Sequence, residues 1–257
     1  MDESRAATAA PFRTARRRPA WLVPGGVALI LVFLTVNVLA DGPLVGVDRR
    51  IRAAVQAQAA SATWRWVGDS WHAPARLLVE LGNNQVAVPV LVLSALIAAA
   101  RHRSPRPLLA AAAGVALLLA TVIPAKILIA RPGPSQPVIA PGSMGVFPSG
   151  HTTTAGVCLA LAVLLLAPGL PATIRRAAVA AMAALCFLVG MALIWCDFHW
   201  FTDVAAGWAL AALIVMAVLR LTRPGQAARG GNSGSGSAVG TGVTAVNKEQ
   251  ADDSARA

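Results

Sequence analysis

The chain has 257 residues, of which 56% are hydrophobic and 13% are charged, and its mean hydropathy is +0.64. These values exclude an ordinary soluble domain and indicate a membrane protein with several spanning helices. The net charge of +11 would suggest nucleic-acid binding in a soluble protein. In a membrane protein it is typical of Lys and Arg held on the cytoplasmic face, so no nucleic-acid partner is predicted.

A basic arm, residues 1–20, precedes the first apolar stretch at residues 21–40. Arg16, Arg17 and Arg18 before an apolar run also fit a secretory signal, whose removal would leave five helices and an outer N-terminus. The run is longer than the roughly 7–15 apolar residues of a signal, which favours a retained membrane helix.

Six apolar stretches have the length and composition of membrane helices. They are residues 21–40, 86–100, 108–130, 152–167, 177–195 and 204–219. Lipid offers no partner to the backbone, so each is expected to be helical. With the N-terminus inside, the cytoplasmic segments hold 15 of the 22 Lys and Arg residues, as short cytoplasmic loops should. The predicted fold class is therefore all-α, a six-transmembrane-helix bundle over residues 21–222 with both termini cytoplasmic.

Two further segments differ from these spans. Residues 41–80 place apolar residues at helical spacing among charged ones and then add Trp64, Trp66 and Trp71, which predicts an amphipathic segment along the outer interface. Residues 223–257 are rich in Gly and Ser and are predicted to form a disordered cytoplasmic tail without chemistry.

A histidine and a carboxylate four residues apart, His199 and Asp203, stand at the start of the last apolar stretch. On a helix this spacing puts both side chains on one face, so Asp203 would fix the imidazole tautomer and leave the other nitrogen free to attack or to take a proton. The pair alone is equally consistent with a structural cap at the helix start.

The sequence Pro148-Ser149-Gly150-His151 stands at the start of the fourth stretch. Free N–H groups and the positive end of the helix dipole bind anions there, and glycine lets the backbone approach them. A phosphate would sit at Ser149 and Gly150, and His151 would protonate a leaving oxygen. A plain turn with an N-cap is the simpler alternative.

Two cations lie near the outer end of the third stretch. Lys126 either extends its ammonium to the interface or meets an anion, because an unpaired charge is costly in lipid. Arg131 follows five residues later. The presence of both favours a role in neutralising a bound phosphate, as cations do in phosphoryl transfer.

These residues, in this order, resemble the type 2 phosphatidic acid phosphatase family, the lipid phosphate phosphatases related to vanadium haloperoxidases. The resemblance covers about residues 20 to 220. It implies that Lys126, Ser149 and the Gly150 backbone bind phosphate, that His151 is the general acid, and that His199 is the nucleophile that forms a phosphohistidine. Asp203 would orient His199. The implied mechanism needs no metal and no cofactor.

Two motif positions depart from that family. The first family motif is Lys, six residues, then Arg-Pro, but Gly133 stands at its arginine; the third has Ser-Arg, five residues, His, three residues, Asp, but Leu193 stands at its arginine. Losing one charged donor commonly costs about 10²–10³ in rate. Arg131 is the best substitute, and Arg49, Arg50 and Arg52 qualify if the interfacial segment folds over the site.

The predicted function is a membrane phosphatase in the plasma membrane, with an extracytoplasmic active site, acting on a lipid phosphate or polyprenyl diphosphate. The alternative is a lipid-phosphate-binding protein of the same fold with impaired catalysis, because of Gly133 and Leu193. A transporter has little support, since ionisable residues are nearly absent from the apolar stretches.

Overall fold

The computed structural model describes residues 21–61 and 73–222, and within these ranges the secondary structure is helical. The basic arm, the three Trp residues at 64, 66 and 71, and the Gly/Ser-rich tail lie outside the described residues. The helices are α1 (Leu22–Leu39), α2 (Pro43–Ala60), α4 (Asn84–His102), α5 (Arg106–Ile129), α6 (Gly150–Leu166), α7 (Ala172–Trp195) and α8 (Phe201–Leu221). Residues 73–80 are also helical. The predicted all-α class is confirmed.

All six apolar stretches correspond to helices. Five of them, α1, α4, α5, α7 and α8, are long and apolar enough to cross a membrane, by length and composition. The sixth, α6, is apolar but has 17 residues. Helix α6 contacts four other helices, so much of its surface is covered by protein. Six spans stay a prediction.

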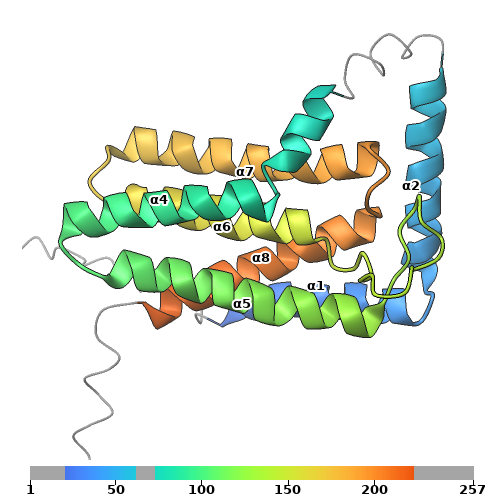
Figure 1. The fold of residues 1–257 in the computed structure, drawn as a ribbon, viewed down its shortest axis with the longest axis horizontal. Coiled ribbons are helices and arrows are strands. Elements are labelled where there is room, and N and C mark those ends of the chain that lie inside the picture. The colour runs from blue at the N-terminus through green and yellow to red at the C-terminus, as the bar shows by residue number, and fades with distance from the viewer. Residues whose placement is uncertain (1–20, 62–72, 223–257) are drawn as a thin grey trace, which may run out of the picture. The chain divides into compact units, whose positions relative to one another are not determined.

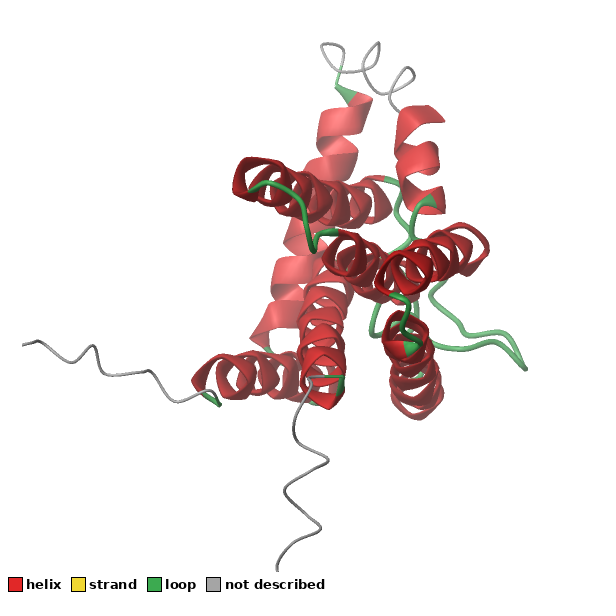
Figure 2. Cartoon of the chain, turned by 90° about the vertical axis from the view of Figure 1, so that its left-hand side faces the viewer, coloured by secondary structure: helices red, strands yellow, loops and turns green. Residues whose placement is uncertain are grey.

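Helix α6 is the centre of the bundle. It contacts α4, α5, α7 and α8, whereas α1 packs on α8 (Figure 1). Small residues permit these contacts, and many positions of α6 are buried. Figure 2 shows most of the bundle helices nearly end-on. Because α6 is surrounded by protein, its N-terminal residues are held by neighbouring helices and are suited to carry a site.

Helix α2 runs across the ends of α5, α6 and α8, at the right of Figure 1. The helix is amphipathic, because it carries four charged residues among its apolar ones. The charged residues are Asp48, Arg49, Arg50 and Arg52. Asp48 is nevertheless only 1% exposed. The predicted amphipathic segment is therefore present, and one of its charged residues points into the protein.

The close approach of α8 to the start of α6 depends on Gly207. A Cβ atom at this position would lie 2.9 Å from Cβ of Thr152 and 3.1 Å from the carbonyl oxygen of Ser149. We expect Gly207→Ala to lower the free energy of unfolding by about 1–3 kcal/mol, the usual cost of overpacking. Thermal unfolding in detergent would measure it. Gly26→Ala is the control, since no described residue outside its own helix backbone lies within 4 Å of a Cβ there. Equal losses in both variants would contradict the packing argument.

Candidate active site

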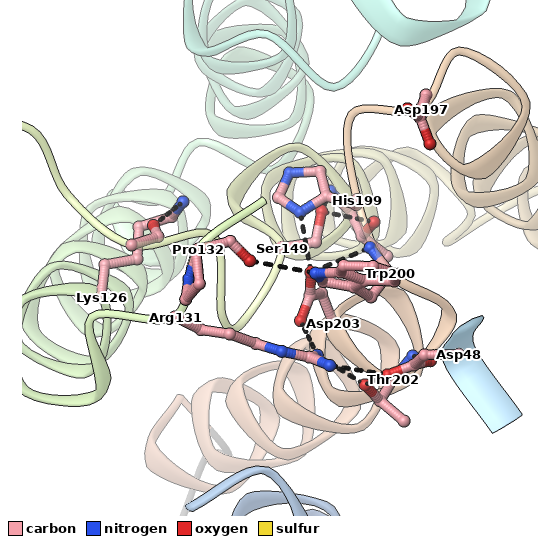
Figure 3. Close-up of polar contacts among 12 residues, drawn as sticks. Asp48, Lys126, Arg131, Pro132, Ser149, Asp197, His199, Trp200, Thr202 and Asp203 are labelled. Atoms are coloured by element: carbon pink, nitrogen blue, oxygen red, sulfur yellow. Dashed lines mark hydrogen bonds and ion pairs between the residues drawn. The ribbon is translucent and has the colours of Figure 1, made fainter. Parts of the chain in front are cut away.

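The residues predicted to form the site gather at the end of the bundle that α2 crosses (Figure 3). They come from the end of α5, the connection from α5 to α6, the start of α6 and the start of α8. A backbone hydrogen bond joins the last two parts, because the N–H of Ser149 donates to the carbonyl oxygen of Asp203 at 3.0 Å. The two motifs, about fifty residues apart in sequence, are thus in direct contact.

Ser149 is the N-cap of α6. Its Oγ accepts hydrogen bonds from the N–H of Thr152 at 3.3 Å and from the hydroxyl of Thr152 at 2.9 Å, and the residue is fully buried. Among the described residues, the N–H groups of Gly150 and His151 have no protein acceptor. These are the first-turn donors that a helix leaves unpaired. The structure thus gives Ser149 a capping role and leaves two backbone donors for an anion.

Lys126, Gly150 and His151 line one cavity of about 340 Å³. The Lys126 stem runs against Gly150, where a Cβ would lie 3.4 Å from Cε, and its ammonium donates to the carbonyl oxygen of Gly145 at 3.0 Å. An ammonium has three donors, so two are left for a ligand. The cavity therefore combines a cation, a helix N-terminus and an imidazole, as the motifs predict.

His199 and Asp203 lie together, but not as two residues on one face of a helix. Helix α8 begins at Phe201 with Trp200 as its N-cap, so His199 precedes the helix. The Asp203 carboxylate reaches back, accepting from the Trp200 N–H at 3.0 Å and facing Nδ1 of His199 at 3.4 Å. The helical i,i+4 interpretation was wrong, because the first-turn position of Asp203 makes it a cap. The orienting contact is present all the same.

Arg131 is buried among protein acceptors. Its Nη1 donates to Asp203 and to the Thr202 hydroxyl, the latter at 2.7 Å, and its Nη2 donates to Asp48 at 2.7 Å. The residue is 8% exposed. A phosphate at this guanidinium would compete with two carboxylates, so these contacts favour a positioning role over phosphate binding.

Arg52 forms a second link from α2. Its Nε and Nη2 donate to the two oxygens of Asp197, both at 2.7 Å. This hydrogen-bonded contact raises the pKa of Arg52 above its ordinary value. Asp197 therefore has a cationic partner and does not oppose a phosphate as an isolated carboxylate.

His199 lines a different and much smaller cavity from His151. This cavity is bounded by α2 and by the segment before α8, and its lining includes Asp48, Arg52 and Asp197. His199 is 8% exposed. The two cavities are connected through protein contacts, since the Ser149 N–H donates to the Asp203 carbonyl oxygen and the Asp203 carboxylate faces His199.

Sequence reasoning missed Asp48 and Thr202. Asp48 was one charge in an amphipathic segment, and Thr202 was one residue inside His-Trp-Phe-Thr-Asp. The available signal was the register of α2, in which Asp48 follows Leu44 by one turn and so shares its inward face.

Within the described residues, no cluster of three or more His, Cys, Asp or Glu side chains has the arrangement of a metal site.

The fold and the site define a helical membrane protein with a buried His-carboxylate pair next to a helix N-terminus. Residues 107–225 match the family model of the PAP2 superfamily, so this region carries the family resemblance that the motifs predict. The structure is similar to a transmembrane PAP2 type phosphatidylglycerolphosphate phosphatase from Bacillus subtilis, with a TM-score of 0.64 and 19% sequence identity over 77% of this chain and 94% of that one. At this identity the likeness shows the fold. A comparison with curated proteins gave no match. The chain is an integral membrane protein of this fold.

Proposed function

We propose that the chain is a membrane phosphatase that hydrolyses a lipid phosphate or polyprenyl diphosphate through a phosphohistidine. The observation that carries the proposal is the contact of His199 Nδ1 with the Asp203 carboxylate at 3.4 Å. A carboxylate at Nδ1 favours the tautomer whose Nε2 carries the free lone pair. Nε2 is then the atom that attacks phosphorus.

The reaction has two balanced steps. Nε2 of His199 forms a bond to phosphorus while the bond to the leaving oxygen breaks, and His151 donates a proton to that oxygen. The leaving group is the lipid alcohol for a monophosphate and the lipid monophosphate for a diphosphate. Water then attacks the phosphohistidine, His151 takes up the water proton, and His199 leaves as the neutral imidazole. The N–H groups of Gly150 and His151, with Lys126, stabilise the charge on the phosphoryl oxygens.

The cavity supports a lipid substrate over a water-soluble one. The α5 side of the 340 Å³ cavity is apolar apart from Lys126, and polar residues line other parts of it. The apolar residues of α5 are Leu118, Leu119, Val122 and Ile123, and the polar ones elsewhere include Asn83, Asn84 and Thr154. An apolar side next to a cation suits a phosphate attached to a hydrocarbon chain. We place this end of the bundle at the extracytoplasmic face of the plasma membrane, with both termini cytoplasmic, on the distribution of Lys and Arg.

The test is phosphate release by the purified chain in lipid nanodiscs. Long-chain phosphatidate and a polyprenyl diphosphate are compared with a short, water-soluble phosphate ester, and release from the long-chain substrates is expected. Binding of these lipids without release would favour the alternative, an impaired lipid-phosphate-binding protein, which Gly133 and Leu193 motivate. Absence of both binding and release would refute both.

Lys126→Gln is expected to reduce kcat/KM for a long-chain substrate by about 10²–10³-fold, the cost of removing one charged donor from a phosphoryl site. Lys126 is the one Lys or Arg that lines the 340 Å³ cavity among the described residues. Steady-state phosphate release measures the effect. Arg106→Gln, at the opposite end of α5, is the matched loss of a cation and should leave kcat/KM unchanged. Equal losses in both variants would argue for a general charge effect.

A further inference from the structure

Two charged residues of helix α2 contact residues 197–202, the segment that contains His199, one on each side of that histidine. Asp48 contacts the start of α8, three residues after His199, where its Oδ1 accepts from the backbone N–H of Thr202 at 2.9 Å. Arg52, one turn later on α2, forms the paired contacts with Asp197, two residues before His199. Figure 3 shows Asp48 and Asp197 on opposite sides of the His199 and Trp200 region.

Asp48 also shares the Arg131 guanidinium with Asp203. Nη2 of Arg131 donates to Asp48 and Nη1 to Asp203, and the side chains of both aspartates are fully buried. Since Asp203 in turn faces His199, the contacts form a continuous series from Asp48 through Arg131 and Asp203 to the imidazole. Charge-assisted contacts of this kind are stronger than neutral ones and fix geometry.

The charge of Asp48 has a definite consequence for His199. With two carboxylates on one guanidinium, Arg131 divides its attraction between them, and Asp203 retains negative charge to accept from Nδ1–H of His199. If residue 48 were neutral, Arg131 would interact with Asp203 alone. Asp203 would then be a weaker acceptor for the imidazole, and His199 would be less well oriented and a poorer nucleophile.

We propose that Asp48 and Arg52 of α2 are positioning residues for His199. Neither belongs to the motifs from which the chemistry was inferred, and the charged groups of both contact protein partners, Arg131 for Asp48 and Asp197 for Arg52. The inference rests on the proposed function, because it assigns a role within that reaction. It makes α2 part of the active site and not only an interfacial anchor.

The test is Asp48→Asn in the full chain. Asparagine keeps an oxygen that accepts from the Thr202 N–H but removes the charge that Arg131 and the Thr202 hydroxyl contact. Because breaking a buried ion pair destabilises a protein, the thermal midpoint is measured beside kcat, and kcat is expressed per folded molecule. We expect kcat to fall by about 10–10²-fold, the cost of a small misplacement of a reacting group, with KM changed by less than about twofold. Formation of the phosphohistidine, followed by rapid quench, should slow by the same factor.

Asp41→Asn is the matched control. It is the same substitution a few residues away, in an exposed pair with Arg49 at 3.8 Å, and it should leave kcat unchanged. A merely structural Asp48 would give a different result: the thermal midpoint would fall, and kcat per folded molecule would equal that of the wild type. That outcome would overturn the inference.

Arg52→Gln removes the contact on the other side of His199. It keeps the inference testable if Asp48→Asn does not fold. The Arg52 and Asp197 pair is about one-third and one-quarter exposed, so its loss should be tolerated, and kcat is expected to fall by about three- to tenfold. An unchanged kcat in this variant, with Asp48→Asn also unchanged or unfolded, would refute the role of α2.

A second measurement separates this inference from the proposed function. Carbethoxylation of His199 by diethyl pyrocarbonate, followed by mass spectrometry, reports its exposure and reactivity without any substrate. A positioning role predicts a rate at least about threefold different from wild type in Asp48→Asn and unchanged in Asp41→Asn. If wild-type protein releases no phosphate, the proposed function fails, while an altered carbethoxylation rate still supports positioning and an unchanged rate overturns it.

Discussion

Replacement of His199 by alanine is expected to lower phosphate release by about 10⁴-fold or more, to the level of the uncatalysed background. Alanine removes the atom that forms the bond to phosphorus, and loss of a nucleophile from a catalytic unit commonly has effects of this size. His199 precedes α8, so its truncation leaves no gap inside a helix, and the thermal midpoint of the variant in detergent reports whether it folds. Phosphate release from a long-chain substrate measures it.

The assignment of His199 as nucleophile is tested further by trapping. Acid-labile, base-stable ³²P label should appear on wild-type chain mixed with labelled substrate and should be absent from His199→Ala. His102→Ala is the control, since His102 is exposed at the last turn of α4. Retention of label on His199→Ala would mean that another residue is the nucleophile, and His151 would be the first to examine.

The helices were predictable because apolar length is a local property. The stretch predicted at residues 177–195 corresponds to α7 from Ala172 to Trp195, and that at residues 204–219 corresponds to α8 from Phe201 to Leu221. The ends differ by a few residues because capping determines them. Pro171 and Trp200, the N-cap residues, are not recognisable from hydropathy.

The chemistry of the site was predictable in part, because each motif is a short segment at a helix start. Ser149 is the N-cap that its type predicts, and Gly150 and His151 follow in the first turn. The cavity that joins Lys126 to His151 follows from placing α5 beside α6. The identity of the reacting histidines was thus contained in local sequence.

The ion-pair network was not predictable from local patterns. Arg131 contacts Asp48 across 83 positions and Asp203 across 72 positions of the chain. No spacing rule connects such residues, and the register of α2, which places Asp48 on the face of Leu44, does not indicate which residues Asp48 contacts. Burial of Asp48 depends on the docking of α2 across the helix ends, which only the tertiary structure specifies.

Gly133 and Leu193, which stand where the family motifs have arginine, lie in different surroundings. Introducing arginine is therefore expected to have different effects at the two positions. Leu193 is fully buried and packs with Val189, Val204 and Ala155, while its carbonyl oxygen accepts from the N–H of Phe198 at 3.0 Å. Its carbonyl thereby fixes the turn that leads to His199. A guanidinium here would enter an apolar cluster without a carboxylate partner among the residues of that cluster.

Leu193→Arg is therefore expected to lower the free energy of unfolding by at least about 3 kcal/mol and to abolish activity, because an uncompensated buried charge is strongly destabilising. Thermal unfolding and phosphate release in detergent measure both effects.

Gly133→Arg is the contrasting variant. A Cβ there would be 3.2 Å from a methyl group of Val146, which can shift, and Gly133 lines a cavity of about 180 Å³ with Arg131. We expect it to fold with a thermal midpoint near wild type and to raise kcat/KM, since the added cation lies near Arg131 at the edge of the proposed site. Stable folding of Leu193→Arg with increased turnover would show that the apolar cluster accommodates the charge, and the account of Leu193 as a packing residue would then be wrong.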